Sequence, residues 1–169
     1  MLSRSHRVVL SVGSMVIVAD QLTKMWAESA LTEHVRQPLL GSFLQLHLLY
    51  NPGAAFSMLT DATWVFAIFS SVISTLILVF AGRIVPLSWQ LAMGGVFGGA
   101  VGNLIDRLTN DPGFGRGLVV DFLELPYWPV FNIADSAVVI AACSMVWMSF
   151  KGLNYDGTAA DDQQNVPSA

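Results

Sequence analysis

The sequence predicts an all-α membrane protein with four transmembrane helices. Its 169 residues are 54% hydrophobic and only 12% charged, with a mean hydropathy of +0.59, whereas soluble domains carry about 25% charged residues. Four apolar runs approach the roughly 20 residues that a helix needs to cross a bilayer core: Val8 to Ala27, Thr63 to Ala81, Leu87 to Ile105 and Val130 to Phe150. They leave two sizeable loops, both on one side of the membrane.

Basic residues in short flanking segments favour one orientation of these spans. With the N-terminus inside, Arg4, Arg7, Arg83 and Lys151 lie in the short inner segments, and the other arginines lie in the longer outer loops. We therefore expect cytoplasmic N- and C-termini. Residues 1–151 form a single domain in this interpretation, and residues 152–169 form a polar, disordered cytoplasmic tail.

The first span could also be the start of a cleavable signal peptide, because Arg4 and Arg7 precede an apolar stretch. However, it continues through Asp20 and Lys24 without a clear small-residue cleavage site, so a transmembrane helix is favoured. Asp20 and Lys24 are four residues apart and share one helix face. They either anchor the span at the membrane interface or orient loop residues around a site.

The first outer loop, from Glu28 to Asp61, contains an alternating segment from Phe43 to Tyr50 that predicts a strand at the membrane surface. We expect His47 to be a solvated residue of this strand. The following residues, Asn51-Pro52-Gly53, predict a turn. Its small residues either let the backbone approach a ligand or simply form a tight turn.

The second span offers no chemistry and is interpreted as scaffold. The third span carries glycines at four-residue spacing: Gly94, Gly98 and Gly102, with Gly95 and Gly99 one step round the helix. Because this spacing lets helices approach closely in lipid, we expect the third span to be the packing hub of the bundle. At its outer end Asn103, Asp106 and Arg107 share one face. The simplest interpretation of these charges is an ion pair between Asp106 and Arg107, but the favoured one is that the three side chains converge where Asp121 and Asp135 should also lie.

Two aspartates, Asp121 and Asp135, flank a short aromatic and proline-rich loop before the fourth span. A carboxylate at the start of a membrane-spanning segment costs free energy, so we expect Asp135 to have a function. Asn132 shares a helix face with Asp135, and Glu124 is expected to be solvated. Asp121 is the natural partner of Asp135, so this pair is the candidate functional site.

Other functional classes find little support in the sequence. The net charge of −4 and the lack of a basic surface do not suggest nucleic acid as a partner. The single cysteine, Cys143, cannot form an internal disulfide, and no Cys/His spacing suggests a metal site. We expect no cofactor.

Five blocks of the sequence resemble, in order and context, the motifs of bacterial lipoprotein signal peptidase, also called signal peptidase II. The blocks are Asp20-Gln-Leu-Thr-Lys24, Asn51-Pro-Gly-Ala-Ala-Phe56, Gly98-Gly-Ala-Val-Gly-Asn-Leu-Ile-Asp-Arg107, Val119-Val-Asp-Phe122 and Phe131-Asn-Ile-Ala-Asp135. The resemblance implies a four-helix aspartyl endopeptidase of the bacterial cytoplasmic membrane. It also implies a small extracytoplasmic β-cradle, built mainly from the first outer loop, and an active site at the outer face.

The resemblance also implies the substrate and the site residues. The substrates are diacylglyceryl-modified prolipoproteins, cut before the lipidated cysteine, and the enzyme is a monomer among membrane lipids. Asp121 and Asp135 become the catalytic pair. The supporting positions are Asp20, Lys24, Asn51, Gly53, Asn103, Asp106, Arg107, Asn132 and Ala134.

Two alternatives come from other functional classes. A small proton- or ion-coupled transporter subunit would place acids near span centres, whereas Asp20, Asp106 and Asp135 cluster at the outer ends. A structural subunit packed through glycines would leave the convergent acids, amides and arginine unexplained.

Overall fold

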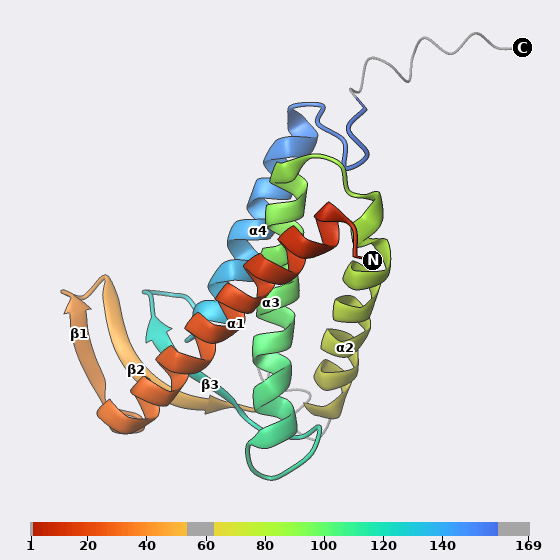
Figure 1. Cartoon of the computed structure of the whole chain (residues 1–169). Coiled ribbons are helices and arrows are strands. Elements are labelled where there is room, and N and C mark those ends of the chain that lie inside the picture. Colours follow the sequence, from red (N-terminus) through yellow and green to blue (C-terminus); the bar gives the residue numbers. More distant parts are fainter. Residues whose placement is uncertain (1, 54–62, 159–169) are drawn as a thin grey trace, which may run out of the picture.

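The computed structural model describes residues 2–53 and 63–158, which form a helical bundle with a small antiparallel sheet at one end (Figure 1). The helices are α1 (Arg4–Ala30), α2 (Thr63–Phe80), α3 (Leu87–Thr109) and α4 (Ile133–Phe150), and a short 3₁₀ turn, η2 (Ala81–Arg83), follows α2. The strands are β1 (Arg36–Leu40), β2 (Leu44–Asn51) and β3 (Val119–Glu124). The prediction of a mostly helical chain is confirmed.

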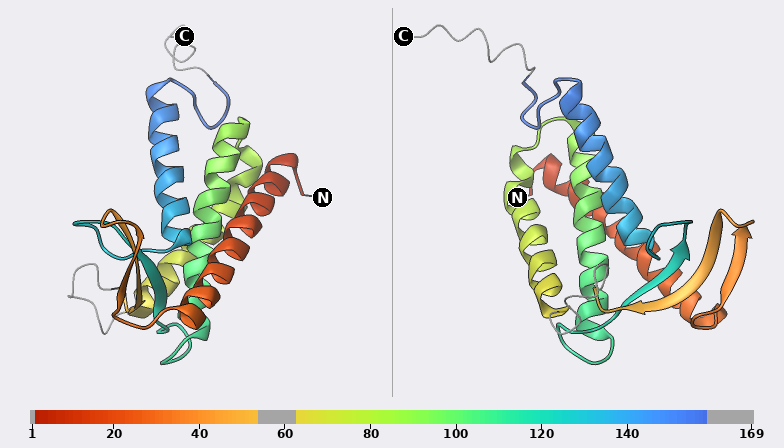
Figure 2. Two further views of the ribbon diagram at one scale, coloured as in Figure 1. Left: turned by 90° about the vertical axis from the view of Figure 1, so that its left-hand side faces the viewer. Right: turned by 180° about the vertical axis from the view of Figure 1, so that it is seen from behind.

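Three of the described helices are long and apolar enough to cross a membrane: α1, α2 extended through Arg83, and α4. The third predicted span, α3, is not among them. It lies at the centre of the bundle, in contact with α1, α2 and α4 (Figures 1 and 2). A helix surrounded by other helices needs fewer large apolar side chains than one that faces lipid.

The glycines of α3 pack against two neighbouring helices, as the sequence predicted. A methyl group added at Gly98 would lie 2.6 Å from Val16 of α1, and one added at Gly102 would lie 2.8 Å from the Asp20 carboxylate. Gly99 faces the other way, where the same addition would meet Val138 of α4 at 2.6 Å. These glycines let α1 and α4 approach the α3 backbone, which brings their polar residues together.

The predicted start of the fourth span at Val130 is three residues too early. Asn132 caps α4: its side chain accepts a hydrogen bond from the Asp135 amide, and the Asp135 side chain accepts one from the Asn132 amide. This capping box satisfies backbone donors that would otherwise lack partners. The preceding residue, Phe131, pairs with Leu123 of β3 instead of joining the helix.

The sheet has the order β1-β2-β3, and its β2–β3 register places Leu49 opposite Asp121. The register shifts between Leu46 and Leu49, so the consecutive residues His47 and Leu48 are both buried. The predicted strand is therefore confirmed, but the expectation of a solvated His47 is wrong. In a regular strand, His47 and Leu48 would lie on opposite faces of the sheet.

Glu124 is half-buried rather than solvated. Its carboxylate accepts hydrogen bonds of 2.7 and 2.8 Å from Arg36 and lies 3.0 Å from His47 Nδ1. The hydrogen bond from Arg36 is the main cause that lowers the pKa of Glu124. The pairing links all three strands, because Arg36 lies in β1, His47 in β2 and Glu124 in β3.

Both ends of the described chain lie near the connection between α2 and α3, and the sheet lies toward the other end of the bundle (Figures 1 and 2). Ser5 donates a hydrogen bond to the Ile84 carbonyl. The Val85 amide donates to the Tyr155 carbonyl, and the Trp89 indole to the Leu153 carbonyl. Residues 152–158, which the sequence assigned to a disordered tail, therefore form hydrogen bonds with the bundle; residues 159–169 lie outside the described residues.

Candidate active site

The two predicted catalytic residues lie at the junction of β3 with α3 and α4. Asp121 lies in β3 and is 2% exposed, and Asp135 lies in the first turn of α4. Asn132, which is fully buried, connects them. Its amide nitrogen donates a 2.7 Å hydrogen bond to Asp121 Oδ1, and its backbone N–H donates to Asp135 Oδ2 at 3.2 Å. One residue thus holds both carboxylates of the predicted pair, one through its side chain and the other through its backbone.

The second oxygen of each carboxylate accepts a hydrogen bond from another asparagine. Asn51, at the end of β2, donates to Asp121 Oδ2 at 2.7 Å, and Asn103 of α3 donates to Asp135 Oδ1 at 2.8 Å. Asn103 Oδ1 also accepts a 3.0 Å hydrogen bond from Asn132. The side chains of three asparagines from three separate segments therefore orient the two carboxylates.

The environment of Asp121 disfavours its ionised form. Burial and the nearby charge of Asp135 raise the pKa of Asp121 to about 7, although the hydrogen bonds from Asn51 and Asn132 favour the carboxylate. Two neighbouring carboxyl groups cannot both ionise cheaply in such a site. The geometry therefore favours a pair that holds one proton near neutral pH.

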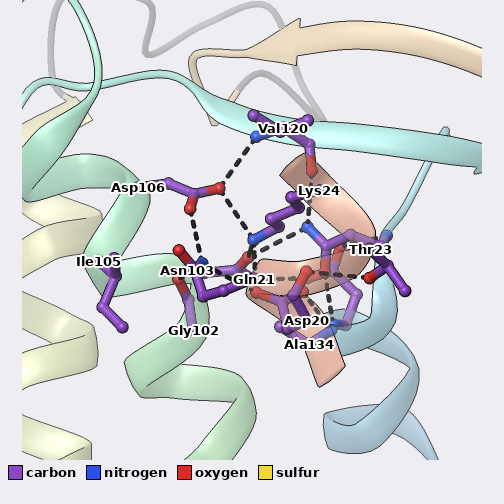
Figure 3. A network of polar contacts seen from close by, with 12 residues as sticks. Asp20, Gln21, Thr23, Lys24, Gly102, Asn103, Ile105, Asp106, Val120 and Ala134 are labelled. Atoms are coloured by element: carbon purple, nitrogen blue, oxygen red, sulfur yellow. Dashed lines mark hydrogen bonds and ion pairs between the residues drawn. The ribbon is translucent and has the colours of Figure 1, made fainter. Parts of the chain in front are cut away.

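Lys24 lies beside this pair, in the buried network that Figure 3 shows. Its ammonium group lies 2.8 Å from Asp20 and 2.8 Å from Asp106, and it donates a 2.9 Å hydrogen bond to Asn103. All three N–H groups of the ammonium therefore have an acceptor. The side chains of Lys24 and Asp20 are 3% and 0% exposed, so they form a buried ion pair rather than an exposed anchor, which favours a role in orienting a site.

Asp20 and Asp106 hold the backbone immediately before each predicted catalytic residue. Asp20 accepts a 2.9 Å hydrogen bond from the amide of Ala134, and Asp106 accepts a 3.0 Å hydrogen bond from the amide of Val120. Val120 precedes Asp121, and Ala134 precedes Asp135. The network around Lys24 thus positions β3 and the start of α4 relative to each other (Figure 3).

Gln21 belongs to this network, although the sequence analysis assigned it no role. Its amide nitrogen lies 3.3 Å from Asp20 and 2.9 Å from Asp106, within hydrogen-bonding distance of both, and also contacts the Gly102 carbonyl. Its position three residues before Lys24 was the available signal, since residues at that spacing share a helix face. The network therefore comprises Asp20, Gln21, Lys24 and Asp106.

Gly53 fixes the orientation of Asn51. Its backbone N–H donates a 2.8 Å hydrogen bond to Asn51 Oδ1, which leaves the Asn51 amide nitrogen to contact Asp121. Gly53 has a φ of +96°, and an added methyl group would lie 2.6 Å from the Phe66 ring. Only glycine fits this turn without strain. Ala54 to Phe56, the rest of the predicted motif, lie outside the described residues.

Arg107 is buried but forms no ion pair with Asp106, so the simplest interpretation of these neighbours is wrong. Its guanidinium lies over the Phe66 ring, 5.0 Å from the ring centre. Among the described residues its Nη1 atom has no hydrogen-bond partner. A buried guanidinium with a free donor is suited to bind an oxygen of a ligand.

Two aspartates linked through Asn132 at one end of a bundle of apolar helices are typical of an aspartic peptidase that works in a membrane. Residues 12–151 match the family model described as signal peptidase (SPase) II, and the chain belongs to this family of aspartic-type peptidases.

Known proteins of similar sequence and structure agree with this assignment. The lipoprotein signal peptidase of Leifsonia xyli subsp. xyli is 38% identical, over 93% of this chain and 77% of its own. That of Mycobacterium avium is 40% identical, over 90% of this chain and 84% of its own. A solved bacterial membrane enzyme superposes with a TM-score of 0.74 at 26% identity, over 95% of this chain and 93% of its own.

Proposed function

We propose that Asp121 and Asp135 are the catalytic pair of an endopeptidase that removes the signal peptide from diacylglyceryl-modified prolipoproteins, cutting before the lipidated cysteine. The family assignment and the relatives named lipoprotein signal peptidases support the activity. The observation that carries the assignment of the pair is the contact of Asn132 with both carboxylates. The comparisons give no support to a transporter subunit.

The chemistry needs one ionised and one protonated carboxyl group. The carboxylate takes a proton from water as the water attacks the scissile carbonyl carbon, and the carboxylic acid donates a hydrogen bond to the carbonyl oxygen, where charge develops. The proton belongs to the pair, because closely coupled groups titrate as a unit. The asparagine N–H groups bind a carboxylate more strongly than a protonated carboxyl group, but they can donate to either, so they orient both groups through each cycle.

The proposal places four helices in the membrane, with α3 as the span enclosed by the other three. The sheet would then form a cradle at the outer face, and both termini would be cytoplasmic. Two observations support this arrangement: the basic residues Arg4, Arg7, Arg83 and Lys151 lie toward the end of the bundle opposite the sheet, and the predicted catalytic pair lies where the sheet meets the helices (Figures 1 and 2). A lipid-modified substrate has its acyl chains in the bilayer and its scissile bond at the headgroup level, where such a site would meet it.

Arg107 is the proposed contact for the substrate beside the catalytic pair. Its Nη1 donor, which has no partner in the part of the chain that the structure describes, suits a carbonyl oxygen of the peptide or an ester oxygen of the lipid group. Stacking on Phe66 holds the guanidinium in place. Substrate oxygens would thus meet a donor that requires no rearrangement of the Lys24 network.

The test is cleavage of a lipidated prolipoprotein peptide by purified protein in detergent with EDTA present. Asp121→Asn and Asp135→Asn each retain the shape of the side chain but remove its ability to exchange a proton, so each should abolish cleavage. Both variants should still insert into membranes and elute as the wild-type protein does. Asp111→Asn, which changes an exposed loop carboxylate, is the matched control and should leave the rate unchanged. Cleavage by either catalytic variant at the wild-type rate would refute the assignment.

A further inference from the structure

A cavity lies at the opposite end of the bundle from the predicted catalytic residues. It has a volume of about 390 Å³ and lies between α2 and α3, with the C-terminal segment at one side. Its walls include Leu76, Ile77 and Phe80 of α2 and Met93 of α3. Only two of its lining side chains are polar, those of Arg83 and Tyr155. The predicted peptidase chemistry makes no use of this cavity.

The position of the cavity along α2 sets the depth of each lining residue in a bilayer. The apolar span from Thr63 to Arg83 has 21 residues, which corresponds to about 30 Å of helix and matches the hydrocarbon core. Arg83 is the last residue of this span, so its guanidinium lies at the level of the lipid headgroups. Leu76 and Phe80 lie one to two turns deeper, at the level of the acyl chains.

Arg83 is a cation without an acidic partner among the described residues. No carboxylate lies within ion-pair distance of it there, and it donates no hydrogen bond. Its guanidinium stacks on the Phe80 ring at 4.9 Å, which holds the charge beside the apolar cavity. A phosphate group would complement this charge and accept hydrogen bonds from the guanidinium.

The C-terminal segment completes the cavity. The Tyr155 carbonyl accepts a 2.9 Å hydrogen bond from the Val85 amide, and the Leu153 carbonyl accepts one from Trp89. These contacts hold the Tyr155 side chain against the connection between α2 and α3, where it lines the cavity. The segment expected to be a disordered tail thus builds one wall of the cavity.

We propose that this cavity binds an anionic phospholipid of the surrounding bilayer, with an acyl chain against α2 and the phosphate at Arg83. An apolar slot with a single cation at the headgroup level has the chemistry of a lipid site between membrane helices. A zwitterionic lipid would fill the slot equally well, but its headgroup cation would oppose Arg83. The site therefore selects for net negative charge on the headgroup.

Native mass spectrometry of the full chain released from mixed micelles tests the proposal. The probes are phosphatidylglycerol and phosphatidylcholine with identical acyl chains, at equal concentration. The wild-type protein should retain one phosphatidylglycerol in preference to phosphatidylcholine. Arg83→Gln should reduce this preference about fivefold, the factor that one basic residue near an anionic surface contributes.

Two matched controls separate the site from general effects. Lys151→Gln removes a basic residue from the same end of the bundle that does not line the cavity, and it should keep the preference. Leu76→Trp fills the slot from an exposed position, and it should lower retention of both lipids, whereas Val79→Trp, also exposed but outside the cavity lining, should not.

Three outcomes would overturn the proposal. These are equal retention of the two lipids by the wild-type protein, an equal loss of preference in Lys151→Gln, and displacement of the lipid by millimolar inorganic phosphate. The last outcome would mean that the cavity binds phosphate itself rather than a phospholipid. Since no substrate is present, the result does not depend on the catalytic assignment.

Discussion

Replacing Lys24 with methionine tests whether the buried network positions the catalytic pair. The substitution keeps the length of the side chain but removes the charge that lies 2.8 Å from both Asp20 and Asp106. These two carboxylates have side-chain exposures of 0% and 4%, so water cannot replace the lost partner. Removing one partner of a buried ion pair costs about 3–5 kcal/mol.

This loss should be visible in thermal unfolding of the purified protein in detergent. A chain of this size loses roughly 2–4 °C of Tm for each kcal/mol, so Lys24→Met should unfold about 6–20 °C below the wild-type protein. Cleavage should fall as well, because Asn103 loses one of the two donors that hold its carbonyl oxygen. Lys151→Met, at an exposed position, should change the free energy of unfolding by no more than about 0.5 kcal/mol.

A double variant shows whether the loss comes from uncompensated charge. Lys24→Met together with Asp106→Asn restores the net charge of the network, and the asparagine oxygen can still accept the Val120 amide. It should recover at least half of the lost Tm. If Lys24→Met unfolds at the wild-type temperature, or the double variant unfolds below both single variants, the proposed role of buried charge is refuted.

Two further predictions concern the proton of the catalytic pair and the packing of α3. Burial and the charge of Asp135 raise the pKa of Asp121 to about 7, so its protonated form is lost as the pH rises, and kcat/KM should fall through about pH 7. Asn51→Leu removes a hydrogen bond that favours the carboxylate form of Asp121. The basic limb of the pH profile should therefore move to higher pH, and the maximal rate should fall. A limb that moves to lower pH would contradict this account. Gly99→Val should disrupt the contact of α3 with Val138 and the start of α4, and should therefore lower both Tm, by several degrees, and the rate of cleavage. Ala100→Val, at a half-buried position of the same helix, should change neither. Equal effects of the two variants would refute the specific packing of Gly99.

Local patterns in the sequence predicted much of the fold. Runs of about 20 apolar residues located the helices, because a helix that faces lipid is apolar along its whole length. The third run was recognised as a packing hub from its glycine spacing, and its contacts with α1 and α4 confirm this. The start of α4 was misjudged because hydropathy alone does not detect the capping box at Asn132.

The environment of individual side chains was less predictable. His47 was expected to be solvated because alternation along a regular strand places it opposite the leucines. The shifted register buries it beside Leu48 and places it next to Glu124. A bulge depends on how two strands pair, and the residues of one strand do not determine it.

The sequence by itself determined the chemical inventory of the site and its order along the chain. Asp20, Asp106 and Asp135 stood out because each occurs near the end of an apolar run, where a charged side chain is costly without a function. The resemblance to the family motifs supplied the other positions, apart from Gln21. Only the tertiary structure decided their partners. It brings Lys24 between Asp20 and Asp106, directs those two carboxylates to the amides before Asp121 and Asp135, and gives Arg107 no ion pair with any of the described residues. These contacts join residues up to 114 positions apart, and such pairings arise from the packing of α1 and α4 against the glycines of α3, which no local pattern encodes.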